Sequence, residues 1–138
     1  MNTKILGLPI SSLQPSKPKC VSPGGSVEEV IRIMRENKFG CVCVADNLEL
    51  VGIVTERDIL TKVVGAGLSA TKTLVSEIMT PQPEYLFADD QVAYALNRMH
   101  VGGFRHIPLV DLKGKPTGVI SVRDIVKHLI KQIEKSDA

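Results

Sequence analysis

Two short stretches of the sequence carry the residues that are best suited to chemistry. Residues 52–58 read GIVTERD and residues 118–124 read GVISVRD. In each stretch a hydroxyl residue stands three positions before an aspartate, an arginine directly precedes that aspartate, and a glycine stands three positions before the hydroxyl. A phosphate needs hydrogen-bond donors and positive charge, and a ribose can donate its hydroxyls to a carboxylate. This combination could therefore hold a nucleoside phosphate.

The same spacing also has a purely structural interpretation. A hydroxyl residue three positions before an acid, at the start of an apolar helical run, is typical of a capping box, in which each side chain bonds the other residue's backbone N–H. The acid also favours the positive end of the helix dipole. For a single copy this interpretation is favoured, because capping residues are common at helix starts.

Three features favour a ligand site over a cap alone. Gly52 and Gly118 lie inside expected strands, where glycine often marks a close approach by a ligand or by another backbone. Arg57 and Arg123 place a positive charge in a first helical turn, where it opposes the helix dipole unless an anion is held there. The strand-to-helix junction also offers N–H groups to a phosphate. Occurring twice makes the motif more specific.

The second half of the chain repeats the pattern of the first. Val92 aligns with Val27 and Asp111 with Asp46, with one extra residue in the second turn. Each repeat predicts a helix, two strands and a second helix. Two such units, joined by a Gly/Ser/Thr-rich connector, would share one core, because a single unit could not cover both faces of its sheet. The expected fold class is therefore α/β in the broad sense, and α+β in detail.

The segments of the first repeat show which residues would form these elements. SVEEVIRIMRENK places apolar residues on one face of a helix, and Ser26 with Glu29 gives it a capping-box start. CVCVA and LVGIV are β-rich runs on either side of a turn, and RDILTKVV returns to helical spacing. The corresponding segments of the second repeat are VAYALNRM, HIPLV, TGVI and VRDIVKHLI. For the first dozen residues a strand, a short helix and a loose arm are all compatible with the sequence.

The composition disfavours several classes of protein. Hydrophobic residues are 43% and charged residues 23%, which is ordinary for a soluble globular protein, and the net charge of +2 is too small to capture a nucleic acid or an anionic membrane. Aromatic residues are 4%, without tryptophan, so stacking platforms for bases are scarce. No apolar run approaches the roughly 20 residues of a membrane span. Three cysteines give no disulfide framework, so we expect a cytoplasmic protein.

Cysteine and histidine residues indicate neither a metal site nor a catalytic site. Cys41 and Cys43 face the same side of a strand and could begin a zinc site, but no matching pair of ligands follows them. Small buried side chains are therefore the favoured interpretation. His100, His106 and His128 are scattered, and no nucleophile near them has a catalytic signature. We expect no catalytic residues and no metal.

The last helix carries more apolar residues than a lone surface helix needs. Ile125, Leu129 and Ile133 follow in steps of four, and Val126 and Ile130 form an adjoining row. This stripe is compatible with the core alone or with an interface.

The paired repeats resemble a tandem cystathionine-β-synthase domain pair, a CBS pair, over about residues 9–134. The matching residues are VSEIMTP at 75–81, FRHIPLVD at 104–111, GIVTERDIL at 52–60 and GVISVRDIV at 118–126. The resemblance divides the chain into one CBS repeat at 9–65, a connector at 66–74 and a second CBS repeat at 75–134. It implies two β-α-β-β-α units with pseudo-two-fold symmetry and a disc-shaped homodimer.

The resemblance also implies a ligand and the residues that would hold it. In that family, adenosyl ligands (AMP, ADP, ATP, S-adenosylmethionine or NADH) lie in clefts between the two repeats. The family's aspartate holds the ribose, and its Thr or Ser with neighbouring basic groups holds the phosphate. These roles fall to Asp58, Thr55 and Arg57 in one cleft, and to Asp124, Ser121 and Arg123 in the other.

The residues expected to enclose the base are taken from the family in the same way. They are Phe39, Gly40, Cys41 and Val42 with Lys19, Cys20 and Val21 for the first cleft, and Arg105, His106, Ile107 and Pro108 with Thr80 and Tyr85 for the second. Cys43 stands where the second repeat has Pro108, and the entry segments read LQPSKP and IMTPQP. The two clefts are therefore expected to be unequal.

The expected function is that of a stand-alone sensor and not of an enzyme. An adenine nucleotide or other adenosyl compound would bind as a ligand, with no catalytic cofactor, and a partner protein would read the change. An interaction scaffold with vestigial ligand sites is the alternative. A membrane role is not expected, and nucleic acid binding is disfavoured by the charge and the aromatic content.

Overall fold

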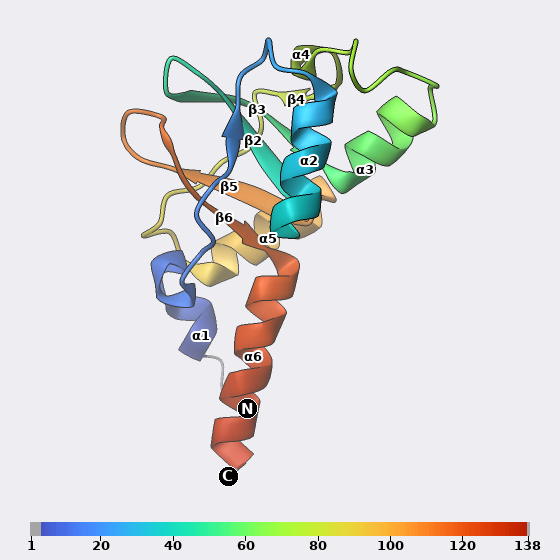
Figure 1. Ribbon diagram of the computed structural model, residues 1–138. Helices are drawn as coiled ribbons and strands as arrows, with labels where there is room; N and C mark the ends of the chain where they lie inside the picture. Colours follow the sequence, from blue (N-terminus) through green and yellow to red (C-terminus); the bar gives the residue numbers. More distant parts are fainter. Residues whose placement is uncertain (1–3, 138) are drawn as a thin grey trace. The chain divides into compact units, whose positions relative to one another are not determined.

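The computed structural model describes residues 4–137, which form a mixed α+β structure of two compact units (Figure 1). Unit 1 contains the described residues up to Lys17, then Glu84–Asp111, and the residues from Thr117 onward. Unit 2 contains Pro18–Pro83 and Leu112–Pro116. Within residues 4–137 no helix has the length and apolar character needed to cross a membrane. The mixed fold class predicted from the repeats is confirmed.

Unit 2 is built on a four-stranded sheet. Its order is β1 (Cys20–Val21), β2 (Cys41–Asp46), β3 (Glu49–Thr55) and β4 (Thr80–Pro81), with β1 parallel to β2 and the other pairs antiparallel. Asn47 and Leu48 connect β2 to β3 with positive φ angles of 50° and 69°, the conformation that a two-residue hairpin turn requires. The predicted hairpin is confirmed, and β1 and β4 extend it on both sides.

Helix α2 (Val27–Asn37) covers this sheet in the way the sequence predicts. Its amino end is capped by Ser26, whose hydroxyl accepts a hydrogen bond from the Glu29 N–H at 3.3 Å. The helix ends at Lys38, which has a left-handed φ of 54°. Val27 and Val30 are fully buried in the core of unit 2. The apolar face therefore packs inward, because burial of that face stabilises an amphipathic helix.

The segment after β3 departs from the predicted regular helix. A short α3 (Glu56–Asp58) continues into a π-helical segment, Ile59–Val64. The Gly65 N–H bonds the Leu60 carbonyl, and the Leu68 N–H bonds the Val63 carbonyl, both at 2.9 Å and both spanning five residues. The wider turns bury Val63 but leave Leu60 and Val64 64% and 67% exposed. The predicted 3.6-residue spacing of RDILTKVV is therefore wrong for this segment.

The connector at 66–74 packs as part of unit 2. The Val27 N–H donates to the Thr73 carbonyl and the Glu28 N–H donates to the Ala70 carbonyl, both at 3.0 Å. The side chain of Thr73 is buried. After the connector come α4 (Val75–Ile78) and β4, which pairs antiparallel with β3. The entry segment of the second repeat thus adds a strand to the hairpin of the first repeat.

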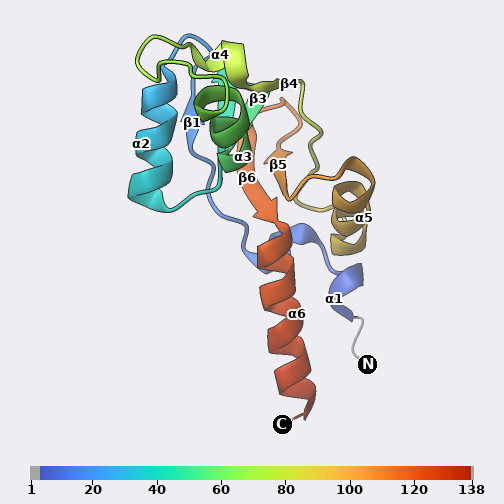
Figure 2. The same cartoon turned by 90° about the vertical axis from the view of Figure 1, so that its right-hand side faces the viewer.

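Unit 1 combines the amino-terminal segment with most of the second repeat. It contains α1 (Lys4–Gly7), a 3₁₀ turn (Ile10–Leu13), α5 (Val92–Gly102), the β5–β6 hairpin (His106–Val110 and Pro116–Ser121) and α6 (Val122–Asp137). Helix α1 lies against α5 and α6 (Figure 2). Ser16 bridges to Val119 of β6, so the entry segment of the first repeat pairs with the second repeat.

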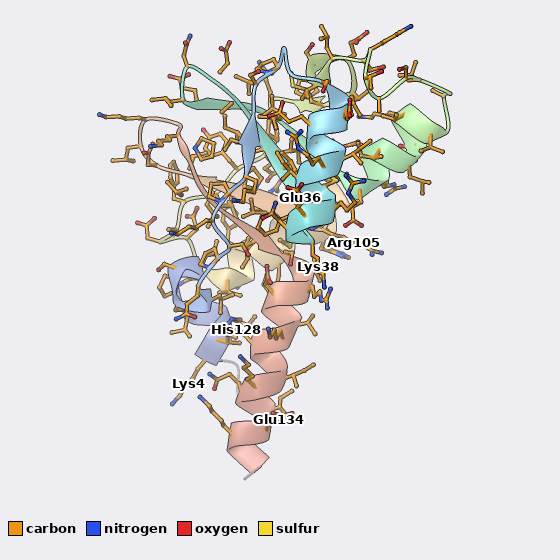
Figure 3. The ribbon with its side chains drawn as sticks, viewed as in Figure 1. Lys4, Glu36, Lys38, Arg105, His128 and Glu134 are labelled. Atoms are coloured by element: carbon orange, nitrogen blue, oxygen red, sulfur yellow. The ribbon has the colours of Figure 1, made fainter. Side chains whose placement is uncertain are left out.

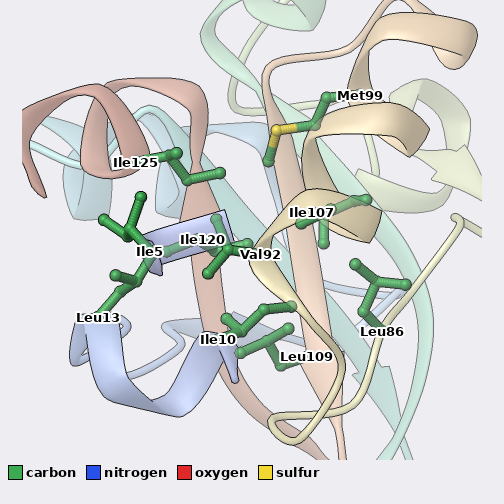
Figure 4. Close-up of a cluster of buried hydrophobic side chains, with 11 residues drawn as sticks. Ile5, Ile10, Leu13, Leu86, Val92, Met99, Ile107, Leu109, Ile120 and Ile125 are labelled. Carbon is green, nitrogen blue, oxygen red and sulfur yellow. The ribbon is translucent and has the colours of Figure 1, made fainter. Parts of the chain in front are cut away.

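The first dozen residues, which the sequence left open, complete the core of unit 1. Ile5, Ile10 and Leu13 are at most 4% exposed and lie among the buried side chains of the second repeat (Figure 4). The other buried members of this core are Leu86, Val92, Ala95, Met99, Ile107, Leu109, Ile120 and Ile125. The short helical turns of the amino-terminal segment place Ile5, Ile10 and Leu13 in this core, and burial of their apolar side chains stabilises the segment.

The apolar stripe of α6 divides between the core and the surface. Ile125 is fully buried and Leu129 packs against the core of unit 1. Val126, Ile130 and Ile133 are 45%, 50% and 54% exposed. Of the predicted stripe, therefore, only Ile125 and Leu129 are used in the core of the unit.

Because the amino-terminal segment contributes to the core, two nearby side-chain truncations in it should have unequal effects on stability. Ile10→Ala removes a fully buried side chain and should lower the free energy of unfolding by about 2–5 kcal/mol. Leu8→Ala changes a side chain that is 39% exposed and should change it by less than about 1 kcal/mol. Urea unfolding of both variants measures the difference, and equal midpoints would show that the segment contributes no core.

Candidate functional site

In unit 2 the first GIVTERD stretch forms a complete capping box at the junction of β3 and α3. The Thr55 N–H donates to Oδ2 of Asp58 at 2.9 Å, and the Asp58 N–H donates to Oγ1 of Thr55 at 3.3 Å. The Thr55 hydroxyl also donates to Oδ2 of Asp58 at 3.2 Å. Asp58 is only 9% exposed.

In unit 1 the GVISVRD stretch forms the same arrangement at the start of α6. The Ser121 N–H and hydroxyl donate to Oδ2 of Asp124 at 3.1 and 2.8 Å. The Asp124 N–H donates to the Ser121 oxygen at 3.1 Å. The two stretches thus adopt one geometry, and the structural interpretation of the motif is confirmed in both.

The box changes what each motif can offer to a ligand. A hydroxyl has a single proton, and here that proton is donated to the aspartate. A phosphate, which only accepts hydrogen bonds from such groups, would have to break this bond. A carboxylate has about four acceptor positions, so Oδ1 keeps its capacity after Oδ2 has accepted two bonds. As built, the box suits a ligand that donates hydrogen bonds, such as a sugar diol, better than it suits a phosphate.

The backbone N–H groups expected to be free at these junctions are partly occupied. The Glu56 N–H donates to the Gly40 carbonyl at 3.1 Å, and the Val122 N–H donates to the Arg105 carbonyl at 2.9 Å. The expectation of free N–H groups is therefore wrong for these two positions and for the two aspartates. Positive charge near the boxes comes instead from the exposed side chains of Arg57 and Arg123.

The two boxes differ in the residue four positions after the aspartate. In unit 2, Lys62 lies 3.1 Å from Oδ1 of Asp58 and also donates to the Ile78 carbonyl at 3.0 Å. In unit 1 the corresponding residue is His128, and no ion pair among the described residues involves Asp124. Lys62 was not among the predicted site residues, although its spacing from Asp58 is visible in the sequence. Lys62 therefore neutralises Oδ1 of Asp58, whereas Oδ1 of Asp124 has no such partner among the described residues.

The close approach of another segment explains Gly52 but not Gly118. A Cβ atom on Gly52 would lie 2.5 Å from Sδ of Met79 and 3.1 Å from the Thr80 carbonyl oxygen. A Cβ on Gly118 would lie 3.4 Å from Cδ1 of Leu109, Cβ of Pro15 and the Ser16 carbonyl oxygen, which is an ordinary contact distance. Of the two causes expected for a close approach, a ligand or another backbone, Gly52 has the second, which the entry segment of the second repeat supplies. Gly52 therefore does not count as evidence for a ligand.

The base-enclosing residues predicted for the first repeat lie together in unit 2. Lys19 and Cys20 are exposed at β1, and β1 pairs with β2, where Cys41 is opposite Thr55. Phe39 and Gly40 are half-buried immediately before β2. The side chains of Cys41 and Val42 are buried, so these two residues could offer a ligand only backbone groups.

The corresponding residues of the second repeat fall in two units. Tyr85 and the 105–108 stretch belong to unit 1, but Thr80 pairs with Ile53 in unit 2. Arg105 is exposed close to the amino end of α6, and His128 lies further along that helix (Figure 3). Ile107 and Pro108 are buried, and His106 is half-buried. Arg105 and His106 therefore belong to the same unit as the Ser121–Asp124 box, whereas Thr80 belongs to unit 2.

Burial of the strand cysteines agrees with the sequence interpretation. Cys41 and Cys43 are 5% and 0% exposed. Among the described residues, no group of three or more His, Cys, Asp or Glu side chains is placed to hold a metal ion.

Comparison with known proteins identifies the family. The CBS domain model matches residues 10–65 and 75–131. The chain belongs to the CBS domain family. These two matches lie within the two repeats of the sequence, so the protein is a CBS pair.

Relatives of this CBS pair include both longer proteins and solved structures. It is 34% identical over 121 residues to the CBS domain-containing protein CBSCBSPB3 of Arabidopsis thaliana, covering 88% of this chain but 22% of that protein. The chain thus spans about a fifth of that relative. A solved protein with CBS domains from Burkholderia ambifaria is 31% identical, with a TM-score of 0.79 over 88% of this chain and 93% of that one.

A third relative was solved with a ligand. A CBS domain protein from Pyrobaculum aerophilum, complexed with AMP, is 25% identical to this chain. It covers 90% of this chain and 99% of its own, with a TM-score of 0.79.

The close approach at Gly52 predicts different responses to the same substitution in the two motifs of the CBS pair. Gly52→Ala should lower the free energy of unfolding by about 1–3 kcal/mol, because the new methyl group meets the Thr80 carbonyl. Gly118→Ala has room for its Cβ and should change the stability by less than about 1 kcal/mol. Chemical denaturation of the two variants tests this order, and a larger loss for Gly118→Ala would contradict it.

Proposed function

We propose that this CBS pair is a sensor module that binds AMP or another adenosyl compound and signals its occupancy to a partner protein. The observation that carries the proposal is the Ser121–Asp124 box, which directs a carboxylate with an available Oδ1 beside an exposed arginine. The AMP complex of the Pyrobaculum aerophilum relative supports an adenosyl ligand. No part of the proposal requires a catalytic step.

The proposed roles of the residues follow from their hydrogen-bonding capacity. Asp124 would accept hydrogen bonds from the ribose hydroxyls through Oδ1, while Oδ2 keeps the box closed. Arg123 and Arg105, both exposed, would supply positive charge for the phosphate. Ser121 would act by orienting Asp124, since its proton is already donated.

The proposed affinities of the two boxes are unequal. At Asp58 a ribose hydroxyl would have to share or displace the ammonium group of Lys62, which also bonds the Ile78 carbonyl. Displacing a bonded cation costs free energy that the Asp124 box does not require. We therefore expect the Asp124 box to bind first and the Asp58 box to bind more weakly.

A panel of adenosyl compounds tests ligand binding. AMP, ADP, ATP, S-adenosylmethionine and NADH are each added to the wild-type protein, and the melting temperature is measured. A compound present at about 100 times its Kd stabilises the protein by roughly 2.7 kcal/mol. For a domain of this size we expect a rise on the order of 2–8 °C for at least one compound.

Two matched variants test the assignment of the ribose site. Asp124→Asn should weaken binding of the stabilising compound by about tenfold or more, which corresponds to about 1.4 kcal/mol. Asp58→Asn should weaken it less, because that carboxylate is already paired with Lys62. Both variants lose part of a helix cap, so Kd is measured by calorimetry rather than inferred from stability. Abolition of binding by Asp58→Asn with no effect of Asp124→Asn would contradict the assignment.

One observation favours a second candidate function, that of an interaction scaffold with vestigial ligand sites. In both boxes the hydroxyl residue and the aspartate already hydrogen-bond each other, and Asp58 is also paired with Lys62. The scaffold predicts that none of the five compounds shifts the melting temperature or produces heat in calorimetry. The sensor is contradicted by that result.

Homodimer formation is part of the sensor proposal. Val126, Ile130 and Ile133 are about half exposed on α6, and burying them against a second copy would remove apolar surface from water. A ligand could then shift the dimer between two states by binding one of them more tightly. A partner protein would read that shift.

An interface substitution tests the dimer. Ile130→Glu places a charge in the apolar row of α6 and should convert a dimer to a monomer in sedimentation experiments. Lys131→Glu, which alters the exposed residue next to it, is the control and should remain dimeric. A monomeric wild-type protein, or a dimeric Ile130→Glu variant, would contradict the proposed interface.

A further inference from the structure

Two of the three cysteines are opposite one another in the sheet of unit 2. Cys20 of β1 is the register partner of Cys43 of β2, and the two strands run parallel. The Cys43 N–H donates to the Lys19 carbonyl at 2.8 Å, which fixes this register. Paired residues on neighbouring strands lie about 4.8 Å apart, and a disulfide needs about 4.4–6.8 Å between its Cα atoms. The backbone therefore already has the spacing that a disulfide requires.

The two thiols have complementary environments. Cys20 is exposed, whereas Cys43 is fully buried. A hydrogen bond from the Cys43 thiol, together with the positive charge of Lys115, lowers the pKa of Cys20 to about 7, although partial desolvation acts in the opposite direction. The same hydrogen bond and burial raise the pKa of Cys43. Cys20 is thus the accessible, reactive sulfur, and Cys43 is the protonated sulfur in contact with it.

Cys41 serves as an internal control for the Cys20–Cys43 pair. It is two residues from Cys43 on the same strand, but its register partner is Thr55 and not a cysteine. Burial, with the negative charge of Asp58, raises the pKa of Cys41 to about 12. Cys41 therefore has neither the access nor the partner that Cys20 has.

We propose that Cys20 and Cys43 form a peroxide-sensitive dithiol that closes to a disulfide between β1 and β2. The Cys20 thiolate attacks one oxygen of a hydroperoxide, becomes a sulfenic acid and releases the other oxygen as hydroxide or alkoxide. The sulfur of Cys43 then attacks the Cys20 sulfur, and its own proton leaves with the hydroxyl as water. Two thiols lose two electrons, and the hydroperoxide gains them. This inference is independent of the proposed ligand.

The disulfide would have a defined structural consequence. Strand β1 has only two residues and is held to the sheet by a short parallel pairing with β2. A covalent link at its first residue would fix β1 in place even when those backbone bonds open. Cys20 and the preceding Lys19 are exposed, so oxidation would reduce the mobility of a surface segment.

Mass spectrometry after a limiting dose of hydrogen peroxide tests the proposal. The intact wild-type chain should lose the mass of two hydrogen atoms, keep one alkylatable thiol and recover fully with dithiothreitol. Trypsin should yield CVSPGGSVEEVIR linked to FGCVCVADNLELVGIVTER. The second peptide contains both Cys41 and Cys43, so a variant must decide between them.

Three variants make the test specific. Cys41→Ala should form the disulfide as the wild type does, and Cys20→Ser should not form it. In Cys43→Ala, alkylation of Cys20 should shift its pH midpoint upward from near pH 7, because the main cause of the lowered pKa is removed. If Cys43→Ala does not fold, the first two variants still decide the linkage.

Other products would overturn the proposal. Oxidation that stops at a sulfinic acid on Cys20, or that links two chains through Cys20 without an intrachain bond, would show that Cys43 does not resolve the intermediate. A linkage that persists in Cys20→Ser, or an alkylation midpoint near pH 9 in the wild type, would also contradict it.

Discussion

The reciprocal hydrogen bonding of a hydroxyl residue and an aspartate at a strand-to-helix junction is the constraint on which the candidate sites depend. Each box holds its aspartate by a backbone N–H and a hydroxyl, so that the carboxylate has one position relative to the first helical turn. A cap of this kind contributes about 0.5–2 kcal/mol to stability. Capping and ligand binding are therefore not competing interpretations. The cap orients a carboxylate, and whether a ligand uses it depends on what else occupies Oδ1.

The two repeats differ in what lies beside Oδ1 of the aspartate. Lys62 pairs with Asp58 and ties the π-helical segment to the end of α4 through the Ile78 carbonyl, whereas the second repeat has His128 at the equivalent position. A buried carboxylate without a partner is costly, so the ammonium group stabilises the box of unit 2. The same contact would oppose a ligand at Asp58. Repeats that began with one geometry would in this way differ in affinity without any change in the motif itself.

Features that are local in the chain could be predicted from the sequence, and features that depend on distant segments could not. The Ser26 cap, helix α2, the β2–β3 hairpin and both capping boxes each follow from a few neighbouring residues. Pairing of Ser16 with Val119, and of Thr80 with Ile53, joins the entry segment of one repeat to the strand of the other, and no local pattern indicates it. The same limitation explains why Gly52 pointed to a ligand in the sequence, since Met79 and Thr80 are far from it in the chain. The π-helical turns have the same apolar residues as a regular helix, so periodicity did not distinguish them.

The central claim is that Oδ1 of Asp124 accepts hydrogen bonds from the ribose of an adenosyl ligand while Oδ2 keeps its bond to the Ser121 N–H. The most direct measurement is the amide chemical shift of Ser121 in ¹H–¹⁵N spectra, recorded with AMP and with 2′,3′-dideoxy-AMP. A large change with AMP, and a much smaller one with the analogue that lacks both hydroxyls, is the predicted result. Equal changes with the two compounds would contradict it.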